Sequence, residues 1–221
     1  MCGRYVFVPG EGFVNMINEQ KRSSFEPENL KPNYNLAPMQ TMPIFTAEGV
    51  VMMQWGLVPS WSKEFKPSFS SINARAETAS EKPLYRTPFK KRRCLVPASG
   101  FYEWQARAGF KQPYLFTLNG RETFNFAGLY DIWYDKVGHE HYSYTILTTT
   151  PNDTMAGVHD RMPVILDADE EEDWLNPIET PADLQLLLDP YDGKMTKFEV
   201  SREVGNVKNN SEALLLPLNS K

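Results

Sequence analysis

The chain has 221 residues, of which 41% are hydrophobic and 23% charged, which is ordinary for a globular protein and enough for one sizeable core. No apolar run approaches ~18 residues and no basic-then-apolar signal pattern opens the chain, so we expect an intracellular, cytoplasmic protein without a membrane segment. The two cysteines, Cys2 and Cys94, exclude a disulfide framework. We expect a single domain over residues 1–221.

The net charge of -5 argues against indiscriminate nucleic-acid binding, but the charge is unevenly distributed. Residues 1–110 hold 14 Lys/Arg and 9 Asp/Glu, a balance of +5, whereas residues 111–221 hold 9 and 19, a balance of -10. The basic run 90–93 either faces phosphates or is the solvated side of a helix. The acidic run 167–173 gives the second half much of its negative charge.

The first functional candidate is Cys2. A small residue at position 2 normally permits removal of Met1, which would leave Cys2 with a free α-amine beside its thiol. The amine titrates near ~7.7 to 8.0 and the thiol near ~8.5, so both are close to activation at neutral pH. A 1,2-aminothiol condenses with an aldehyde to a Schiff base and then to a five-membered thiazolidine. The alternative is that Cys2 is an ordinary residue near a chain end.

The next elements in chain order are a strand, a short amphipathic helix, an ordered loop and a hairpin. They are predicted over Tyr5–Val8, Gly10–Gln20, Tyr34–Pro38 and Ile44–Met53. An aromatic loop follows, in which Trp61 is the better candidate for an exposed, ligand-contacting tryptophan and Trp55 for a core residue.

The segment from Ile72 to Thr78 holds polar residues at alternate positions. On a strand, Asn73, Arg75 and Glu77 would point to one face, either toward a ligand or toward water at a sheet edge. A basic helix is predicted over Leu84–Arg93.

Two strands, Cys94–Pro97 and Phe101–Trp104, are expected around a turn at residues 98–100. Glu103 is notable because it lies within the second, apolar strand. A carboxylate there either points to water or serves in a site where desolvation raises its pKa.

Three more strands are predicted over Pro113–Leu118, Phe124–Trp133 and Tyr142–Thr149. His139 and His141 alternate near the tip between the last two, but no carboxylate or cysteine follows at ligand spacing. We therefore expect no metal site.

A capped turn at residues 151–153 leads to His159 and Arg161, a plausible proton shuttle and phosphate clamp before a buried strand. Two helices near 169–175 and 180–188 and a strand at 198–201 complete the chain. Many short strands with peripheral helices predict an α+β fold with a β-rich, barrel-like core of short mixed strands.

Several of these segments together resemble the signature blocks of the SRAP family, the SOS response-associated peptidase-like proteins that process abasic sites in DNA. The blocks are Cys2–Tyr5, Tyr34–Pro38, Trp55–Trp61, Asn73–Glu77, Gly100–Trp104 and His159–Pro163. The resemblance extends from Cys2 to about Asn210 and implies the SRAP-type fold over the whole chain.

The resemblance implies an abasic-site sensor that binds single-stranded DNA and cross-links the ring-opened sugar aldehyde to Cys2 as a thiazolidine, shielding the lesion in the DNA damage response. The catalytic positions it implies are Cys2, Asn73, Glu103 and His159. The DNA-binding positions it implies are Arg4, Asn35, Pro38, Trp61, Arg75 and Arg161. No metal, cofactor or membrane is expected, and the partner is single-stranded DNA containing abasic sites, bound by a monomer that is nucleoid-associated when on DNA.

In this interpretation Cys2 supplies both nucleophiles, Glu103 relays a proton, His159 protonates the sugar ring oxygen and Asn73 holds the reacting groups. Two other functions remain open. One is an N-terminal-nucleophile cysteine peptidase or self-processing amidase, in which the same thiol attacks a peptide carbonyl. The other is a module that binds single strands without chemistry.

Overall fold

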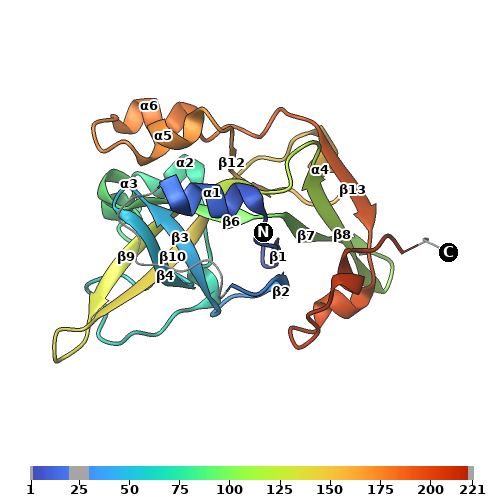
Figure 1. Ribbon diagram of the computed structural model, residues 1–221, viewed down its shortest axis with the longest axis horizontal. Helices are drawn as coiled ribbons and strands as arrows, with labels where there is room; N and C mark the ends of the chain where they lie inside the picture. The colour runs from blue at the N-terminus through green and yellow to red at the C-terminus, as the bar shows by residue number, and fades with distance from the viewer. Residues whose placement is uncertain (1, 20–29, 219–221) are drawn as a thin grey trace.

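The computed structural model describes residues 2–19 and 30–218, and five of its strands form a closed ring, seen at the left of Figure 1. The ring runs β10-β4-β3-β6-β9 and closes because β9 also pairs with β10. Its members are β3 (Thr41–Thr46), β4 (Gly49–Trp55), β6 (Arg93–Ala98), β9 (Phe124–Tyr134) and β10 (Glu140–Thr149). β4 runs parallel to β10 and the other pairs are antiparallel, so the predicted barrel-like core of mixed strands is confirmed.

A second sheet of five strands lies beside this barrel, at the right of Figure 1. Its order is β13 (Met195–Glu199), β8 (Phe110–Leu118), β7 (Gly100–Arg107), β1 (Tyr5–Phe7) and β2 (Asn33–Leu36). Three short strands extend the barrel sheet: β5 (Asn73–Arg75), β11 (Met162–Pro163) and β12 (Ile165–Leu166).

The helices are short and lie around the strands (Figure 1). They are α1 (Glu11–Glu19), α2 (Ala76–Ala79), α3 (Arg86–Lys91), α4 (Asp153–Ala156), α5 (Glu170–Leu175) and α6 (Pro181–Leu186), with 3₁₀ turns η2 (Phe69–Ser71), η3 (Arg202–Gly205) and η4 (Glu212–Leu215). None of the helices within the described ranges is long and apolar enough to cross a membrane.

Aromatic side chains fill the barrel. Tyr5 lies edge-on to Trp55 with ring centroids 5.2 Å apart, and Trp55 stacks on Tyr144 at 6.3 Å. The Tyr5 and Tyr144 hydroxyls are hydrogen-bonded at 2.8 Å, which satisfies both groups in the interior. Glycine is required at position 128, where β9 pairs with β6, because a β-carbon there would lie 2.8 Å from the Cys94 sulfur.

Two sequence expectations are corrected. The segment that begins at Tyr34 is expected to be an ordered loop, but residues 33–36 form strand β2, which pairs with β1. The two strands expected on either side of residues 98–100 are present, with β6 in the barrel and β7 in the second sheet. The basic helix ends at Lys91, and Arg93 is buried in β6, where its guanidinium donates to the carbonyls of Phe89 and Trp174. Lys90 and Lys91 are exposed, so only part of the basic run is a solvated face.

Candidate active site around Cys2

The pairing of β1 with β7 brings the start of the chain next to Glu103. Tyr5 pairs with Phe101 in an antiparallel register, and Arg4 accepts a hydrogen bond from the Tyr102 amide at 3.0 Å. Continued by two residues, this register places positions 2 and 3 alongside Glu103. Cys2 is fully buried there.

Asn73 reaches Cys2 from the barrel. It begins β5, which runs parallel to β10 with Asn73 opposite Ile146. The buried Asn73 amide donates from Nδ2 to the Cys2 carbonyl oxygen at 2.7 Å. Its Oδ1 is also buried and has no hydrogen-bond partner among the described residues. One acceptor beside Cys2 therefore remains available for a further donor.

His159 lies on the other side of Glu103. It follows α4, whose start is capped by the Asn152 side chain accepting from the Met155 amide at 3.0 Å. The His159 amide donates to the Met155 carbonyl at 3.1 Å, which fixes the residue at the end of the helix. His159 Nε2 lies 4.0 Å from Glu103 Oε2. The structure thus brings together all four predicted catalytic residues, which come from four separate parts of the chain.

His159 Nδ1 has two contacts that hold the ring. It lies 3.1 Å from the Arg161 amide, which can donate to it, and 2.8 Å from Asp160 Oδ1, which can accept from it. The two contacts require opposite roles of Nδ1, so both tautomers of the ring have a partner there. The ring can therefore present Nε2 toward Glu103 either as a donor or as an acceptor.

Burial changes the titration of the two reactive groups. It raises the pKa of Glu103, while the nearby His159, when protonated, acts in the opposite direction. Burial also raises the pKa of the Cys2 thiol far above its ordinary value, and the negative charge of Glu103 adds to this. The sequence-based expectation used the pKa of an exposed thiol, and burial shifts the Cys2 thiol away from that value.

A cleft of about 560 Å³ opens the site to solvent. Glu103 and His159 lie in its wall, together with Trp104, Lys111 and Gly205. Our sequence interpretation did not single out Trp104 or Lys111 as functional. Trp104 could have been found from the sequence, because it is the neighbour of Glu103 on a predicted strand. Lys111 could not, because it lies at the cleft only through the pairing of β7 with β8.

Arg4 and Asn35 form a hydrogen-bonded unit. Arg4 is half-buried and donates from Nε to Asn35 Oδ1 at 3.1 Å, and its Nη2 lies 3.4 Å from the Gly205 carbonyl. Asn35 is buried, and its Nδ2 donates to the carbonyls of Val204, Asn206 and Asn209 at 3.1, 3.0 and 2.9 Å. Asn35 therefore holds Arg4 and the segment after η3, and its amide is used within the fold.

The other residues expected to contact DNA differ in how exposed they are. Trp61 is 69% exposed and Trp55 is fully buried, which confirms the sequence-based assignment of the two tryptophans. Pro38 is half-buried and precedes Met39, which has a left-handed backbone at φ 72°. Such a conformation in a non-glycine residue is strained and often occurs at functional loops.

The expected common face of Asn73, Arg75 and Glu77 is absent from β5. The strand ends at Arg75, which is exposed, and Glu77 lies in α2. Glu77 instead forms a two-contact ion pair with Arg161, with Nη2 2.9 Å from Oε2. This pair lowers the pKa of Glu77, and Arg161 also donates to the Thr148 carbonyl.

No cluster of three or more His, Cys, Asp or Glu within the described ranges has the geometry to hold a metal ion. His139 and His141 do share a carboxylate, with their ring nitrogens 3.1 and 3.6 Å from Asp135 Oδ2.

Comparison with known proteins identifies relatives over almost the whole chain. The model of the SOS response associated peptidase (SRAP) family matches residues 1–207. The chain is 42% identical to the abasic site processing protein YoqW of Bacillus subtilis, over 97% of this chain and 99% of that protein. It is 36% identical to the abasic site processing protein HMCES of Gallus gallus, over 99% of this chain and 78% of that protein.

Two crystal structures have a similar fold. A protein of Bacteroides thetaiotaomicron superposes with a TM-score of 0.87 at 30% identity, covering 98% of this chain and 99% of that one. A protein of Bordetella bronchiseptica has a TM-score of 0.73 at 23% identity, over 90% of this chain and 100% of that one, and is alike in fold.

The class of protein is defined by a closed mixed barrel, a second sheet beside it, and a cysteine, an asparagine, a glutamate and a histidine that converge next to strand β1 of that second sheet. The chain belongs to the SOS response associated peptidase (SRAP) family.

Proposed function

We propose that this protein captures abasic sites in single-stranded DNA as a covalent thiazolidine on Cys2, after Met1 has been removed. The observation that carries the proposal is the convergence of Asn73, Glu103 and His159 on a fully buried Cys2. The names of the relatives, abasic site processing proteins, support the class of substrate.

The reaction forms two bonds to one carbon. The Cys2 amine attacks the aldehyde carbon of the ring-opened sugar, and the resulting carbinolamine loses its oxygen as water to give an imine. The thiol sulfur then adds to the imine carbon, the thiol proton is transferred to nitrogen, and the thiazolidine ring closes. The balance is one aldehyde and one aminothiol converted to one thiazolidine and one water.

Glu103 is the proposed proton carrier for these steps. Its buried carboxylate lies beside Cys2, and burial raises its pKa, so it is a stronger base than an exposed glutamate. The raised pKa of the Cys2 thiol makes such a base necessary, because little thiolate exists at neutral pH without one. The amine therefore reacts first and the thiol second.

His159 and Asn73 complete the mechanism. His159 Nε2 lies 4.0 Å from Glu103 Oε2, and we assign to it the transfer of a proton to the ring oxygen of the sugar as the ring opens. Asn73 holds the Cys2 carbonyl through Nδ2, and its unpartnered Oδ1 can accept a hydrogen bond from the reacting amine.

Single-stranded DNA is the proposed partner because the exposed groups suit it. Arg75 is exposed, Arg4 is half-buried, and Arg161 is available to a phosphate if it exchanges its Glu77 partner. Trp61 presents an exposed indole on which an unpaired base can stack. We further propose that the protein acts as a monomer, in the cytoplasm and on nucleoid DNA, without a cofactor.

The test is cross-linking to an oligonucleotide with one abasic site. Wild type should give a band that survives denaturation, and Cys2→Ala should give none. Cys94→Ala is the matched control, because Cys94 is buried in the barrel, and it should cross-link like wild type. A denaturant-stable adduct in Cys2→Ala would refute the proposal.

A second candidate is an N-terminal-nucleophile peptidase, which the peptidase in the family's name favours. The same buried thiol would attack a peptide carbonyl, with the amine or Glu103 as base. Incubation of the trimmed protein with a peptide panel distinguishes the two, because only the peptidase cleaves peptides in a Cys2-dependent manner.

A further inference from the structure

The loop that carries Trp61 is fastened to the β9–β10 hairpin. We call residues 59–67, between β4 and η2, the Trp61 loop. The Ser60 amide donates to Asp131 Oδ2 at 2.9 Å, and the Trp133 indole Nε1 donates to the Ser62 carbonyl at 2.8 Å. The two bonds lie on either side of Trp61. The backbone at Trp61 is therefore held at both ends while its side chain stays 69% exposed.

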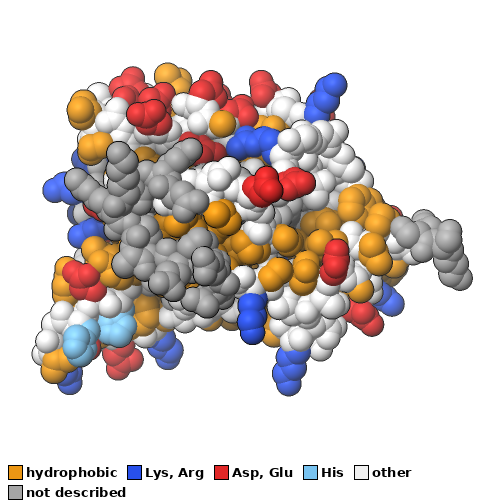
Figure 2. All heavy atoms as spheres, viewed as in Figure 1, with side chains coloured by type: hydrophobic (Ala, Val, Ile, Leu, Met, Phe, Trp, Pro, Cys, Tyr) orange, Lys and Arg blue, Asp and Glu red, His pale blue; other side chains and the backbone are white. Residues whose placement is uncertain are grey.

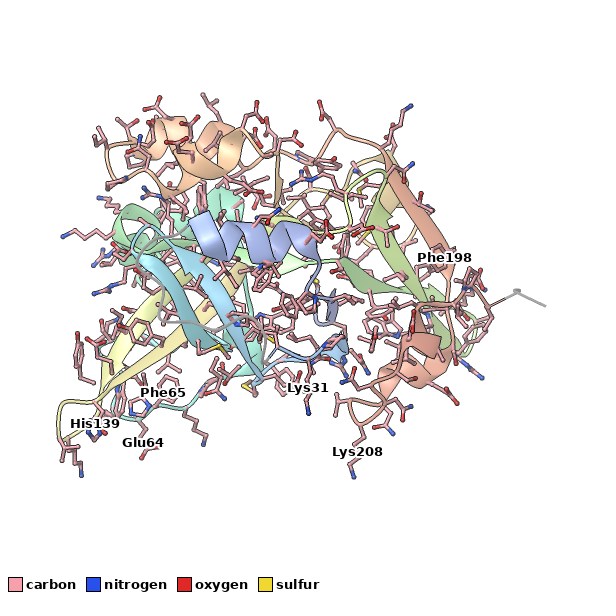
Figure 3. All side chains as sticks on the ribbon, viewed as in Figure 1. Lys31, Glu64, Phe65, His139, Phe198 and Lys208 are labelled. Atoms are coloured by element: carbon pink, nitrogen blue, oxygen red, sulfur yellow. The ribbon has the colours of Figure 1, made fainter. Side chains whose placement is uncertain are left out.

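Aromatic packing holds the far end of the loop. Phe65 lies 5.1 Å from the His141 ring and 6.0 Å from the Trp133 ring, and those two rings are 5.5 Å apart. Figure 3 shows Glu64 and Phe65 at the hairpin end that carries His139. Such contacts contribute beyond the apolar area that they bury.

Asp131 is an unusual anchor because its carboxylate is buried, with 3% exposure. Its Oδ1 lies 2.5 Å from Arg92 Nη1 and accepts from the Ile132 amide at 2.9 Å, so Oδ2 is left for the Ser60 amide. A hydrogen bond to a buried charge is among the stronger kinds. The carboxylate thus links α3's end, the hairpin and the Trp61 loop.

The loop starts close to the candidate active site. The Val58 amide donates to Ser143 Oγ on β10 at 2.8 Å, and Asn73 lies opposite Ile146 on the same strand. Three residues along a strand correspond to about 10 Å. Trp61 lies three residues beyond Val58, which adds at most about another 10 Å, so a strand bound at Cys2 needs several nucleotides to reach the indole.

We propose that Asp131 and Trp133 are positioning residues for DNA binding: they fix the Trp61 loop in the conformation in which the indole stacks on a base near the lesion. This inference depends on the proposed function of the protein. A loop that is already ordered loses less conformational entropy when DNA binds, so stacking contributes more of its free energy to affinity. Neither residue touches DNA in this account.

The test is a double-mutant cycle on affinity for an undamaged single strand, measured by fluorescence anisotropy. Trp133→Phe keeps a ring but removes the bond to Ser62, and should weaken binding ~3- to 10-fold, as coupling energies of neighbouring residues allow. In a Trp61→Ala background the same substitution should change affinity by less than about twofold, since there is no indole left to position. Val137→Ala, at the exposed hairpin tip, is the control and should leave affinity unchanged.

Asp131→Asn, of the same shape, provides a second variant if Trp133→Phe does not fold. Equal weakening in both backgrounds, or none in either, would overturn the inference. An unchanged affinity of Trp61→Ala would overturn it too, but would leave the Cys2 adduct standing, because adduct formation at saturating DNA is scored separately.

Discussion

At the residue scale, the proposed order of bond formation depends on the different titration of the Cys2 thiol and the Cys2 amine. Burial raises the pKa of the thiol, so the sulfur needs a base before it can attack, whereas the amine of a processed terminus titrates near neutral pH. Glu103 is the nearby carboxylate on which our mechanism depends, and its own pKa is raised by burial. Replacing Glu103 with glutamine therefore removes the ionisable carboxyl group while keeping the size and shape of the side chain.

Glu103→Gln should slow adduct formation by ~10² to 10⁴-fold, the usual effect of losing a positioned acid or base. In wild type the rate should rise with pH both as Glu103 ionises and as the Cys2 amine loses its proton, because the carboxylate and the neutral amine are the active forms. The variant should keep only the rise that comes from the amine. Single-turnover rates from pH 4 to 8 measure both effects. An unchanged rate in the variant would exclude Glu103 as the base.

The same substitution should make the fold more stable at pH 7. A carboxyl whose pKa is higher in the folded than in the unfolded chain favours folding while protonated, and this contribution is lost as the pH rises through the folded pKa. Glutamine does not ionise, so Glu103→Gln should raise Tm at pH 7, by about 2 to 4 °C for each kcal/mol gained in the free energy of unfolding. The increase in Tm should become smaller toward pH 4. Calorimetry at the two pH values measures it.

At the scale of elements, one buried amide joins β2 to the segment after η3. Asn35 donates to three backbone carbonyls and accepts from Arg4, so it holds both the wall of the cleft at Gly205 and a predicted DNA-contacting arginine. The family resemblance implies a DNA-binding role for Asn35. Its contacts favour an indirect effect through Arg4.

Asn35→Ala should destabilise the protein by about 2 to 4 kcal/mol, because buried carbonyls lose their donor. Hydrogen exchange should increase in residues 202–210 more than in the barrel. Urea unfolding and exchange measured by mass spectrometry test this. Asn119→Ala, an exposed amide at the end of β8, is the control and should remain within about 0.5 kcal/mol of wild type. Uniform exchange across the chain would contradict the assignment.

Local pattern predicted the strands well but not their partners. Alternating apolar residues identify β8, β9 and β10, since a strand shows its buried face in its own sequence. Nothing in β6 or β7 shows that the chain changes sheets between them at Ser99, because pairing depends on distant segments. Glu103 and His159 are 56 positions apart, so only the family resemblance, and no local pattern, predicted that they meet. The raised pKa of the Cys2 thiol depends on burial by distant segments, which no local pattern contains either.

At the scale of the whole molecule, charge separates into two regions. Residues 167–192 contain ten Asp or Glu and no Lys or Arg. Figure 2 shows acidic side chains along the upper edge, where α5 and α6 lie in Figure 1. A phosphate backbone is repelled from this edge. DNA should therefore be directed away from this edge and toward Arg4, Arg75 and Arg161, although the protein is acidic overall.

The salt dependence of binding to single strands reports how many of these arginines touch phosphate. With contacts from Arg4, Arg75 and Arg161, the slope of log K against log[salt] should be about -2, at ~0.7 for each contact. Arg75→Ala should reduce its magnitude by ~0.7. Arg86→Ala, on the exposed side of α3, is the matched control and should leave the slope unchanged. A slope near zero would show that arginine contacts to phosphate do not drive binding.

The central claim is that the α-amine and thiol of Cys2 together capture a sugar aldehyde. Intact-mass measurement of the trimmed protein, before and after it meets an abasic oligonucleotide, tests this most directly. We predict a mass equal to protein plus oligonucleotide minus one water, stable to borohydride because the thiazolidine has no imine left to reduce. An adduct of that mass with Cys2→Ala that also resists borohydride, or no covalent species with wild type, would contradict the account.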